Sequence, residues 1–180
     1  MRILYRVRQF WQVLTADSNS QNLDQARQVL SSGQMDLFMR LQPGERAHSL
    51  QILQQLCVQG EENSDLLIAA LLHDIGKSVH PLRLRERVVI VIAKTLFPNR
   101  IRAWGQGEPE RWRRPFVIAE QHGTWGAEMA AQAGVSALTA SIIRRHHDSI
   151  ESNGSGEELN HPLPDEEQLI LKLQSLDNHY

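Results

Sequence analysis

The chain has 180 residues and a formal net charge of −2, with 41% hydrophobic and 22% charged residues. This length predicts one domain with a sizeable buried core. The near-neutral charge argues against a general affinity for membranes, and we expect no stable nucleic acid partner. The single cysteine, Cys57, excludes an internal disulfide and favours a reducing compartment. Because apolar residues surround it, Cys57 is expected to pack in the core.

Charge is distributed unevenly along the chain. Residues 77–114 carry ten Lys and Arg against three Glu, whereas residues 151–180 carry seven acids and one Lys. The N-terminus lacks the continuous apolar region of a secretory signal. The longest apolar run elsewhere, Val88–Ala93, is too short to span a bilayer. We therefore expect a cytoplasmic protein without a transmembrane segment.

The first expected element is an amphipathic helix over Met1–Thr15. Its apolar side would be formed by Ile3, Val7, Phe10, Trp11 and Leu14. The basic residues flanking that side are Arg2, Arg6 and Arg8. The favoured interpretation is a helix packed on the domain, and docking on a membrane surface or a partner is the alternative.

A polar linker and a short helix are expected next. The linker is Asp17–Asn22, and the helix is expected to run from Asn22 to Ser32 and to end at Gly33. An apolar group between Met35 and Leu41 follows. We place a boundary here, with residues 1–42 as a helical extension and residues 43–180 as the main domain.

The main domain is predicted to begin with a helix that has Pro43 in its first turn and contains His48. The most informative stretch, DLLIAALLHDIGK, follows at Asp65–Lys77. Its apolar run consists of strong helix formers and predicts a buried helix with Ser64 as N-cap. Gly76 is expected to end that helix.

A helix is expected over Leu82–Phe97, where a strand would have no partner. Pro98 should stop it, and Asn99–Arg114 is expected to be irregular. A helix over Pro115–His122 and a second over Ala127–Ala133 are predicted to be separated by two glycines, Gly123 and Gly126.

The C-terminal part is predicted to contain two helices. The first, capped by Ser136, places His146 at its end and on its apolar side. A loop over Ile150–Pro164 precedes the last helix, Asp165–Asn178, which contains Asp177. Together the pattern predicts an all-α fold, a bundle of about seven to nine helices.

Histidines and acids recur at helix ends and on apolar helix sides. They are His48, His73 and Asp74, His122, His146 and His147, and Asp177. Burying such groups without partners costs several kcal/mol, by a rough estimate. Five segments of a helical bundle that each supply imidazole or carboxylate groups would form a divalent metal site. His161 and His179 fall outside the pattern and are expected at the surface. His80, in the loop after Lys77, is expected to face solvent, with a position lining the site as the alternative.

The ordered set H…HD…H…HH…D resembles the HD-domain superfamily of metal-dependent phosphohydrolases. The motif Leu-Leu-His-Asp-Ile-Gly-Lys around His73 and Asp74 is typical of that family. The H-x-x-x-G run from His122 to Gly126 is also typical of that family. The resemblance spans Glu45 to Asp177 and implies an HD-domain helical bundle.

This resemblance implies a site for two metal ions. His48, His73, Asp74 and Asp177 would hold the first ion. His122, His146 and His147 would hold the second, with Asp74 bridging the two. Mixed nitrogen and oxygen ligands suit iron or manganese, with zinc, nickel or magnesium as alternatives.

The implied reaction is hydrolysis of a small phosphate ester, nucleotide-like or a cyclic dinucleotide, by a metal-bound hydroxide. Asp74 and Lys77 are the candidate catalytic residues, and Lys77 would meet a substrate phosphate. The Gly-Tyr-Pro signature of the cyclic-di-GMP-cleaving branch is missing after His147, where Asp148 follows. A di-iron HD oxygenase and a non-catalytic HD module for ligand sensing or protein interaction remain alternatives. The oligomeric state stays open.

The basic stretch Arg83–Arg114, interleaved with Trp104 and Trp112, allows two interpretations. It could attract an anionic substrate, or it could be a solvated surface with two core tryptophans.

Overall fold

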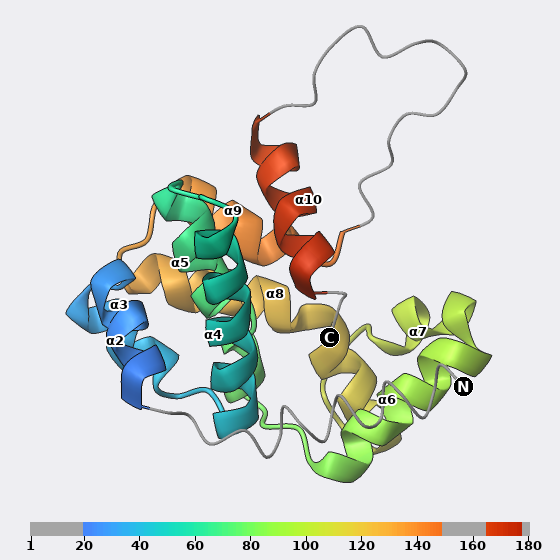
Figure 1. Ribbon diagram of the computed structural model, residues 1–180. Helices are drawn as coiled ribbons and strands as arrows, with labels where there is room; N and C mark the ends of the chain where they lie inside the picture. The colour runs from blue at the N-terminus through green and yellow to red at the C-terminus, as the bar shows by residue number, and fades with distance from the viewer. Residues whose placement is uncertain (1–19, 149–164, 178–180) are drawn as a thin grey trace, which may run out of the picture.

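Figure 1 shows the computed structural model of the protein, which describes residues 20–148 and 165–177, with side chains from residue 23 onward. The predicted helix over Met1–Thr15, the loop over Ile150–Pro164, His161 and His179 lie outside these residues. The described chain is all-α, with nine α-helices, two 3-10 helices and no strand. None of its helices is both long and apolar enough to cross a membrane.

The helices of the described residues follow one another along the chain. They are α2 (Ser20–Val29), α3 (Ser32–Phe38), α4 (Pro43–Val58), α5 (Ser64–Leu72), η1 (Ile75–Ser78), α6 (Leu84–Leu96), α7 (Pro98–Trp104), η2 (Arg111–Arg113), α8 (Arg114–Gln132), α9 (Ala137–Arg145) and α10 (Asp165–Asp177).

The apolar helix α5 packs mainly against α4 and α9, and it also contacts α2 and α10 (Figure 1). Asn63, not Ser64 as predicted, caps its N-terminus by accepting a hydrogen bond from the backbone of Leu66. Leu66, Leu71 and Leu72 are fully buried. Each such side chain contributes about 1.5–3 kcal/mol when removed from water. The start of α5 is tied to α9, because Asp65 accepts a hydrogen bond from Thr139 at 2.7 Å.

The elements α2 and α3 pack against the same core, through buried residues that include Ala26, Leu30 and Phe38. The predicted end of the helix from Asn22 to Ser32, which corresponds to α2, is wrong. It stops at Val29, and Ser31 caps a second helix that contains Gly33 and the group from Met35 to Phe38. A serine with a glutamine three residues later, here Gln34, is a capping box, and it outweighs the glycine as a signal.

Two further predictions in the middle of the chain are wrong. Pro98 does not leave an irregular segment behind it, because it occupies the first turn of α7, where its missing N–H is not needed. Gly123 and Gly126 do not divide two helices. They lie inside the continuous helix α8, where their lack of side chains allows neighbouring backbone to approach. The helix predicted over Leu82–Phe97 is confirmed as α6.

The elements α6, α7 and η2 form a separate group at the lower right of Figure 1. Their buried residues make two small clusters, one around Ile90 and Ile118 and the other around Ala93, Ile101 and Phe116, outside the main core. Cys57 corrects another expectation, since it is exposed on α4.

Candidate metal centre

Side chains from five parts of the chain meet where the ends of several helices converge. His48 comes from α4, and His73 and Asp74 follow α5 directly. His122 projects from α8, and His146 caps the end of α9. The remaining two are His147, next in the chain, and Asp177, the last residue of α10. The structure thus brings together all seven residues that the sequence analysis grouped.

One half of the group joins α4, α5 and α10. The Nε2 atom of His48 lies 2.8 Å from Oδ1 of Asp177. The Nε2 atom of His73 lies 3.6 Å from the same oxygen, which is too long for a hydrogen bond. A segment 129 residues away in the sequence therefore completes this half of the group.

The carboxylate of Asp74 lies between the two halves. Its Oδ1 is 3.7 Å from Nε2 of His73, 3.3 Å from that of His122 and 4.0 Å from that of His146. Its other oxygen, Oδ2, accepts a hydrogen bond of 2.6 Å from the ammonium group of Lys77. Asp74 thus turns one oxygen toward three imidazoles and the other toward a lysine.

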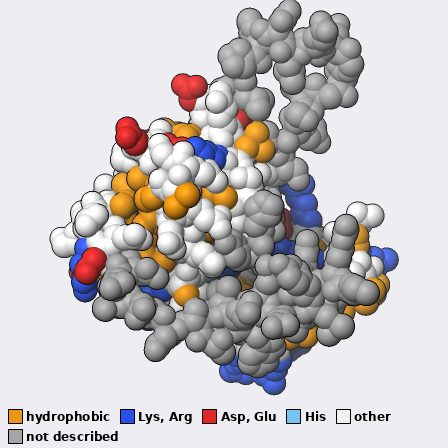
Figure 2. All heavy atoms as spheres, viewed as in Figure 1, with side chains coloured by type: hydrophobic (Ala, Val, Ile, Leu, Met, Phe, Trp, Pro, Cys, Tyr) orange, Lys and Arg blue, Asp and Glu red, His pale blue; other side chains and the backbone are white. Residues whose placement is uncertain are grey.

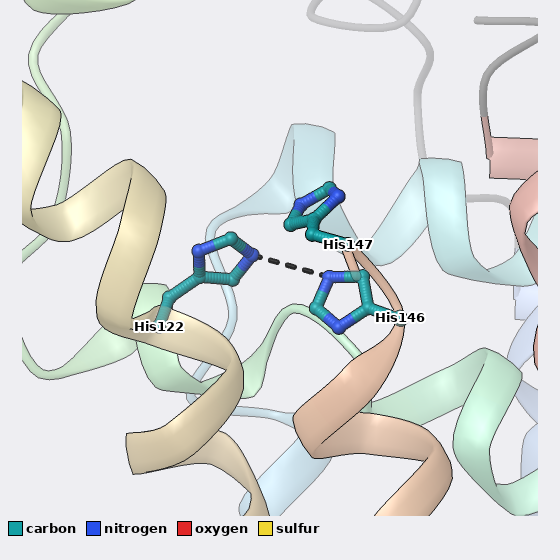
Figure 3. A group of neighbouring side chains, drawn as sticks. All are labelled: His122, His146 and His147. Carbon is teal, nitrogen blue, oxygen red and sulfur yellow. Dashed lines mark hydrogen bonds between the residues drawn. The ribbon is translucent and has the colours of Figure 1, made fainter. Parts of the chain in front are cut away.

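The other half of the group consists of imidazoles alone (Figure 3). The rings of His122, His146 and His147 have centroids 4.0–5.1 Å apart. The Nε2 atoms of His122 and His146 lie 3.2 Å from each other. His147 faces this pair from the exposed side.

Backbone carbonyls fix the tautomers of three of these histidines. Nδ1 of His73 lies 2.9 Å from the carbonyl of Ala70, and Nδ1 of His122 lies 3.0 Å from that of Ile118. Nδ1 of His146 lies 2.6 Å from a carbonyl one turn earlier in α9. A carbonyl only accepts, so each Nδ1 carries the hydrogen and each Nε2 presents a lone pair.

With these tautomers, the Nε2 atoms that point into the group carry lone pairs that a cation could accept. We call these Nε2 atoms the inner nitrogens. Nε2 of His73 is buried and has no hydrogen-bond partner in the described part of the chain. The Nε2 atoms of His122 and His146 face each other with two lone pairs, an arrangement that neutral imidazoles alone do not stabilise. A divalent cation would accept these lone pairs, and carbonyl-bound Nδ1–H is the usual orientation of a metal-binding histidine.

Two sets of potential ligand atoms lie within 4.8 Å of one another, the set His48, His73 and Asp74 and the set His122, His146 and His147. Both contain the imidazole nitrogens that borderline divalent ions prefer, and the first adds a carboxylate. The residues present therefore fit divalent metal, and these are the residues that would hold it.

The protonation states of the imidazoles suit the same role. Burial, together with the nearby ammonium of Lys77, lowers the pKa of His122. Burial and the neighbouring His147 lower the pKa of His146 well below its usual value. Although residue His147 is exposed, its ring lies against the other two, and desolvation and His122 lower its pKa to about 3. All three rings are therefore neutral ligands near pH 7.

The carboxylates, in contrast, remain ionised. Burial disfavours the charged form of Asp74, but Lys77 and His73 outweigh this effect and hold its pKa well below the usual value. Burial likewise opposes ionisation of Asp177, and His48 and His73 outweigh it, so the pKa of Asp177 is lowered. Burial also opposes charge on His73, yet Asp74 and Asp177 raise its pKa. A positive charge between the ionised carboxylates of Asp74 and Asp177 would therefore be stabilised.

Sequence reasoning missed a buried ion pair beside the site. Glu45, one turn before His48 on α4, is 3% exposed and accepts a hydrogen bond of 2.7 Å from Arg87 on α6. Arg87 also donates to Gln42 at 2.8 Å. These contacts hold α6 against the helix that carries His48. Neither residue stood out in the sequence, because their separation of 42 residues gives no local signal.

Other candidate residues lie outside the group. His80 is half-buried, with its ring 5.3 Å from that of Trp125, and it is absent from both sets of potential ligands. Trp104 packs among Phe97 and Phe116, whereas Trp112 is 60% exposed. The two tryptophans of the basic stretch are therefore not both core residues.

Comparison with protein-family models identifies the HD domain over residues 46–177. Because this match covers most of the chain, the protein belongs to the HD-domain family, an all-α family whose members are generally, but not all, metal-dependent phosphohydrolases. Neither the curated proteins nor the solved structures compared with this chain gave a match.

Proposed function

We propose that this protein is a phosphohydrolase that uses two divalent metal ions. His48, His73, Asp74 and Asp177 would hold the first ion. His122, His146 and His147 would hold the second, with Asp74 between them. Iron or manganese suits this mixture of imidazole and carboxylate, and zinc, nickel or magnesium are alternatives.

The observation that carries the proposal is the set of inner imidazole nitrogens without proton donors. Nε2 of His73 is buried without a partner, and the Nε2 atoms of His122 and His146 lie 3.2 Å apart with their Nδ1–H groups directed to carbonyls. Most buried polar atoms of structural side chains have a hydrogen-bond partner. Here three inner nitrogens keep free lone pairs, which supports metal binding in both halves of the group.

Bound divalent ions would supply Lewis acidity toward a phosphoryl oxygen and toward a water molecule. The chain itself would hold the anionic substrate near the group. Lys77 is suited to this task, because its ammonium is fixed at 2.6 Å by Oδ2 of Asp74, the carboxylate whose Oδ1 faces the imidazoles. Burial opposes its charge, but Asp74 outweighs burial and raises the pKa of Lys77. Lys77 therefore stays cationic at neutral pH.

A second positive charge faces the same region from α6. The pKa of Lys94 is lowered by desolvation and then by the charge of Lys77, while Asp177 and Asp74 act in the opposite direction. Two ammonium groups near the carboxylates support an anionic, phosphorylated substrate, and we propose a small nucleotide-like one. The reaction would be hydrolysis of its phosphate ester, with Asp74 and Lys77 as the central residues.

The test is elemental analysis of the purified protein, combined with a phosphatase and phosphodiesterase screen in manganese and in iron. We expect about two equivalents of metal and release of phosphate or of a nucleoside phosphate. Less than about half an equivalent under metal-replete conditions would overturn the proposal in favour of a non-catalytic module. Oxygen consumption without phosphate release across a nucleotide panel would overturn it in favour of an oxygenase.

A further inference from the structure

The outward side of α6 is apolar although it faces solvent. Ile90 and Ala93 point inward and are buried, as the helical period predicts. Away from these two residues, six apolar residues of α6 are between 44% and 63% exposed. They are Leu84, Val88, Val89, Val91, Ile92 and Leu96. We call this set the α6 outer face. Contiguous exposed apolar surface of this kind marks a site for a partner or a membrane.

Aromatic side chains extend the α6 outer face toward α7 and η2. Phe97 follows Leu96 directly and is 50% exposed. Its ring centroid lies 5.8 Å from that of Trp104, which lies 5.7 Å from that of Trp112. Trp112 is 60% exposed. The exposed indole of Trp112 is therefore connected, through Trp104, to Phe97 at the C-terminal end of α6.

Exposed arginines surround this surface. They are Arg83 and Arg85 at the start of α6, Arg100 and Arg102 on α7, and Arg111 and Arg113 on η2. In Figure 2 blue side chains lie along the lower and right-hand edges of the molecule, with orange side chains beside them. The exposed acids of the same segment are only Glu108 and Glu110. Arg85 and Arg100 form no ion pair with any other described residue, so their charge is available.

We propose that the α6 outer face, with Phe97, Trp112 and these arginines, is a docking surface for an anionic lipid bilayer. Aliphatic side chains would enter the boundary between headgroups and acyl chains. Trp112 would lie at headgroup depth, where tryptophan is enriched. The arginines would contact anionic headgroups, whose surface potential attracts clustered Lys and Arg. Binding would be peripheral.

Charge favours this occupant over two others. A second copy of the chain would bring one arginine-rich surface against another, and like charges would repel. The first fifteen residues of the chain contain three arginines and no acid, so they would meet the same repulsion. The phosphates of single-stranded nucleic acid would pair with the arginines. However, nucleic acid has no aliphatic group that would bury the exposed Leu, Val and Ile side chains of α6.

The experiment is co-sedimentation of the full chain with vesicles of phosphatidylglycerol and phosphatidylcholine, and with vesicles of phosphatidylcholine alone. We expect at least about a tenfold larger partition constant for the anionic vesicles, and a decrease as salt is raised. The double variant Val88→Gln/Ile92→Gln should lower binding about tenfold. The double variant Arg85→Gln/Arg113→Gln should lower binding and remove part of the salt dependence.

The matched control is the double variant Val58→Gln/Leu171→Gln. It removes two exposed apolar side chains on α4 and α10, which are 82% and 37% exposed. Its vesicle binding should equal that of the unchanged chain. Circular dichroism tests whether each variant is folded, and Trp112→Ala, at a site in a 3-10 turn, gives an independent test if the α6 variants unfold.

Three results would overturn the proposal. One is equal binding to neutral and anionic vesicles, or binding to neither. Another is a dimer in light scattering that the Val88→Gln/Ile92→Gln variant dissociates, which would assign the face to a second copy. The third is tight binding of a single-stranded oligonucleotide without vesicle binding, which would assign the arginines to nucleic acid.

Discussion

Gly76 and His122 approach so closely that the carbonyl oxygen of His122 occupies the position of a Cβ atom at residue 76. The backbone N–H of Gly126, one turn later on α8, lies on the same side. The 3-10 helix η1 therefore packs backbone to backbone on α8. This contact sets the position of Asp74, two residues before Gly76, relative to His122, and it explains why glycines stand on both elements.

We expect Gly76→Ala to destabilise the protein by about 3 kcal/mol or more, because the overlap is with backbone and no flexible side chain can yield. Gly33→Ala is the matched control. Gly33 lies in α3 with open space around its Cα, so alanine there should stabilise by about 0.5 kcal/mol. Urea unfolding measures both free energies. Equal stability of Gly76→Ala and the unchanged chain would refute the close packing.

Local sequence signals were sufficient for most helices. The apolar run of α5 and the serine cap of α9 predicted those elements, and Pro43 correctly marked the start of α4. The glycines of α8 were misleading. A glycine signals a break only when the backbone must turn, and Gly123 and Gly126 instead admit the carbonyl of Arg144 and the backbone at Gly76. That contact depends on the tertiary arrangement, which no local pattern encodes.

The grouping of histidines and acids could also be predicted, because polar residues at the ends of apolar helices are costly without partners. The resemblance to the HD-domain family then implied that His48 and Asp177 belong to one metal site. The ion pair between Glu45 and Arg87 could not be predicted, since a charged residue in a first helical turn is ordinarily solvated. The exposure of Cys57 was missed because apolar neighbours in a helix do not specify which side faces the core.

Replacing Asp74 should affect both halves of the candidate metal centre. Its Oδ1 faces His73 at 3.7 Å and His122 at 3.3 Å, so Asp74→Ala removes a carboxylate that faces both halves. We expect loss of both metal ions and of hydrolysis. Elemental analysis and phosphate release provide the measurements. Asp36→Ala, at an exposed acid on α3, should change neither. Retention of full activity in Asp74→Ala would exclude a bridging role.

Removal of one imidazole should affect metal binding in one half of the group and spare the other half. His122→Ala takes one nitrogen from the set of three histidines and leaves the contact between His48 and Asp177 intact. We expect about one equivalent of metal to remain and activity to fall at least about a hundredfold. His80→Ala, against Trp125, is the control with unchanged metal. Unchanged metal content in His122→Ala would argue for a single-ion site.

Lys77 should act on substrate binding more than on metal binding. Lys77→Ala removes the ammonium group that Asp74 Oδ2 holds at 2.6 Å. We expect KM for a phosphorylated substrate to rise about tenfold, equivalent to about 1.4 kcal/mol, with metal content preserved. Lys77→Arg should restore part of the affinity, because it keeps the charge in a different geometry. An unchanged KM in Lys77→Ala would leave the lysine without a role in binding.

The ion pair between α6 and α8 should contribute less to the free energy of unfolding at low pH. Glu86 accepts a hydrogen bond of 2.6 Å from Arg114, and both side chains are largely shielded from water. Burial opposes ionisation of Glu86, but Arg114 and the backbone N–H of Arg83 outweigh it, so its pKa is lowered in the folded state. A lowered pKa stabilises the fold above the unfolded value of 4.5, and this contribution is lost as pH falls through the folded value.

Urea unfolding between pH 7 and pH 3 should therefore show a loss of unfolding free energy that Glu86→Gln reduces by about 1 kcal/mol. Glu128→Gln, at an exposed acid on the same helix as Arg114, should retain the full pH dependence. An acid sensitivity that is identical in Glu86→Gln and the unchanged chain would show that this ion pair does not hold α6 in place.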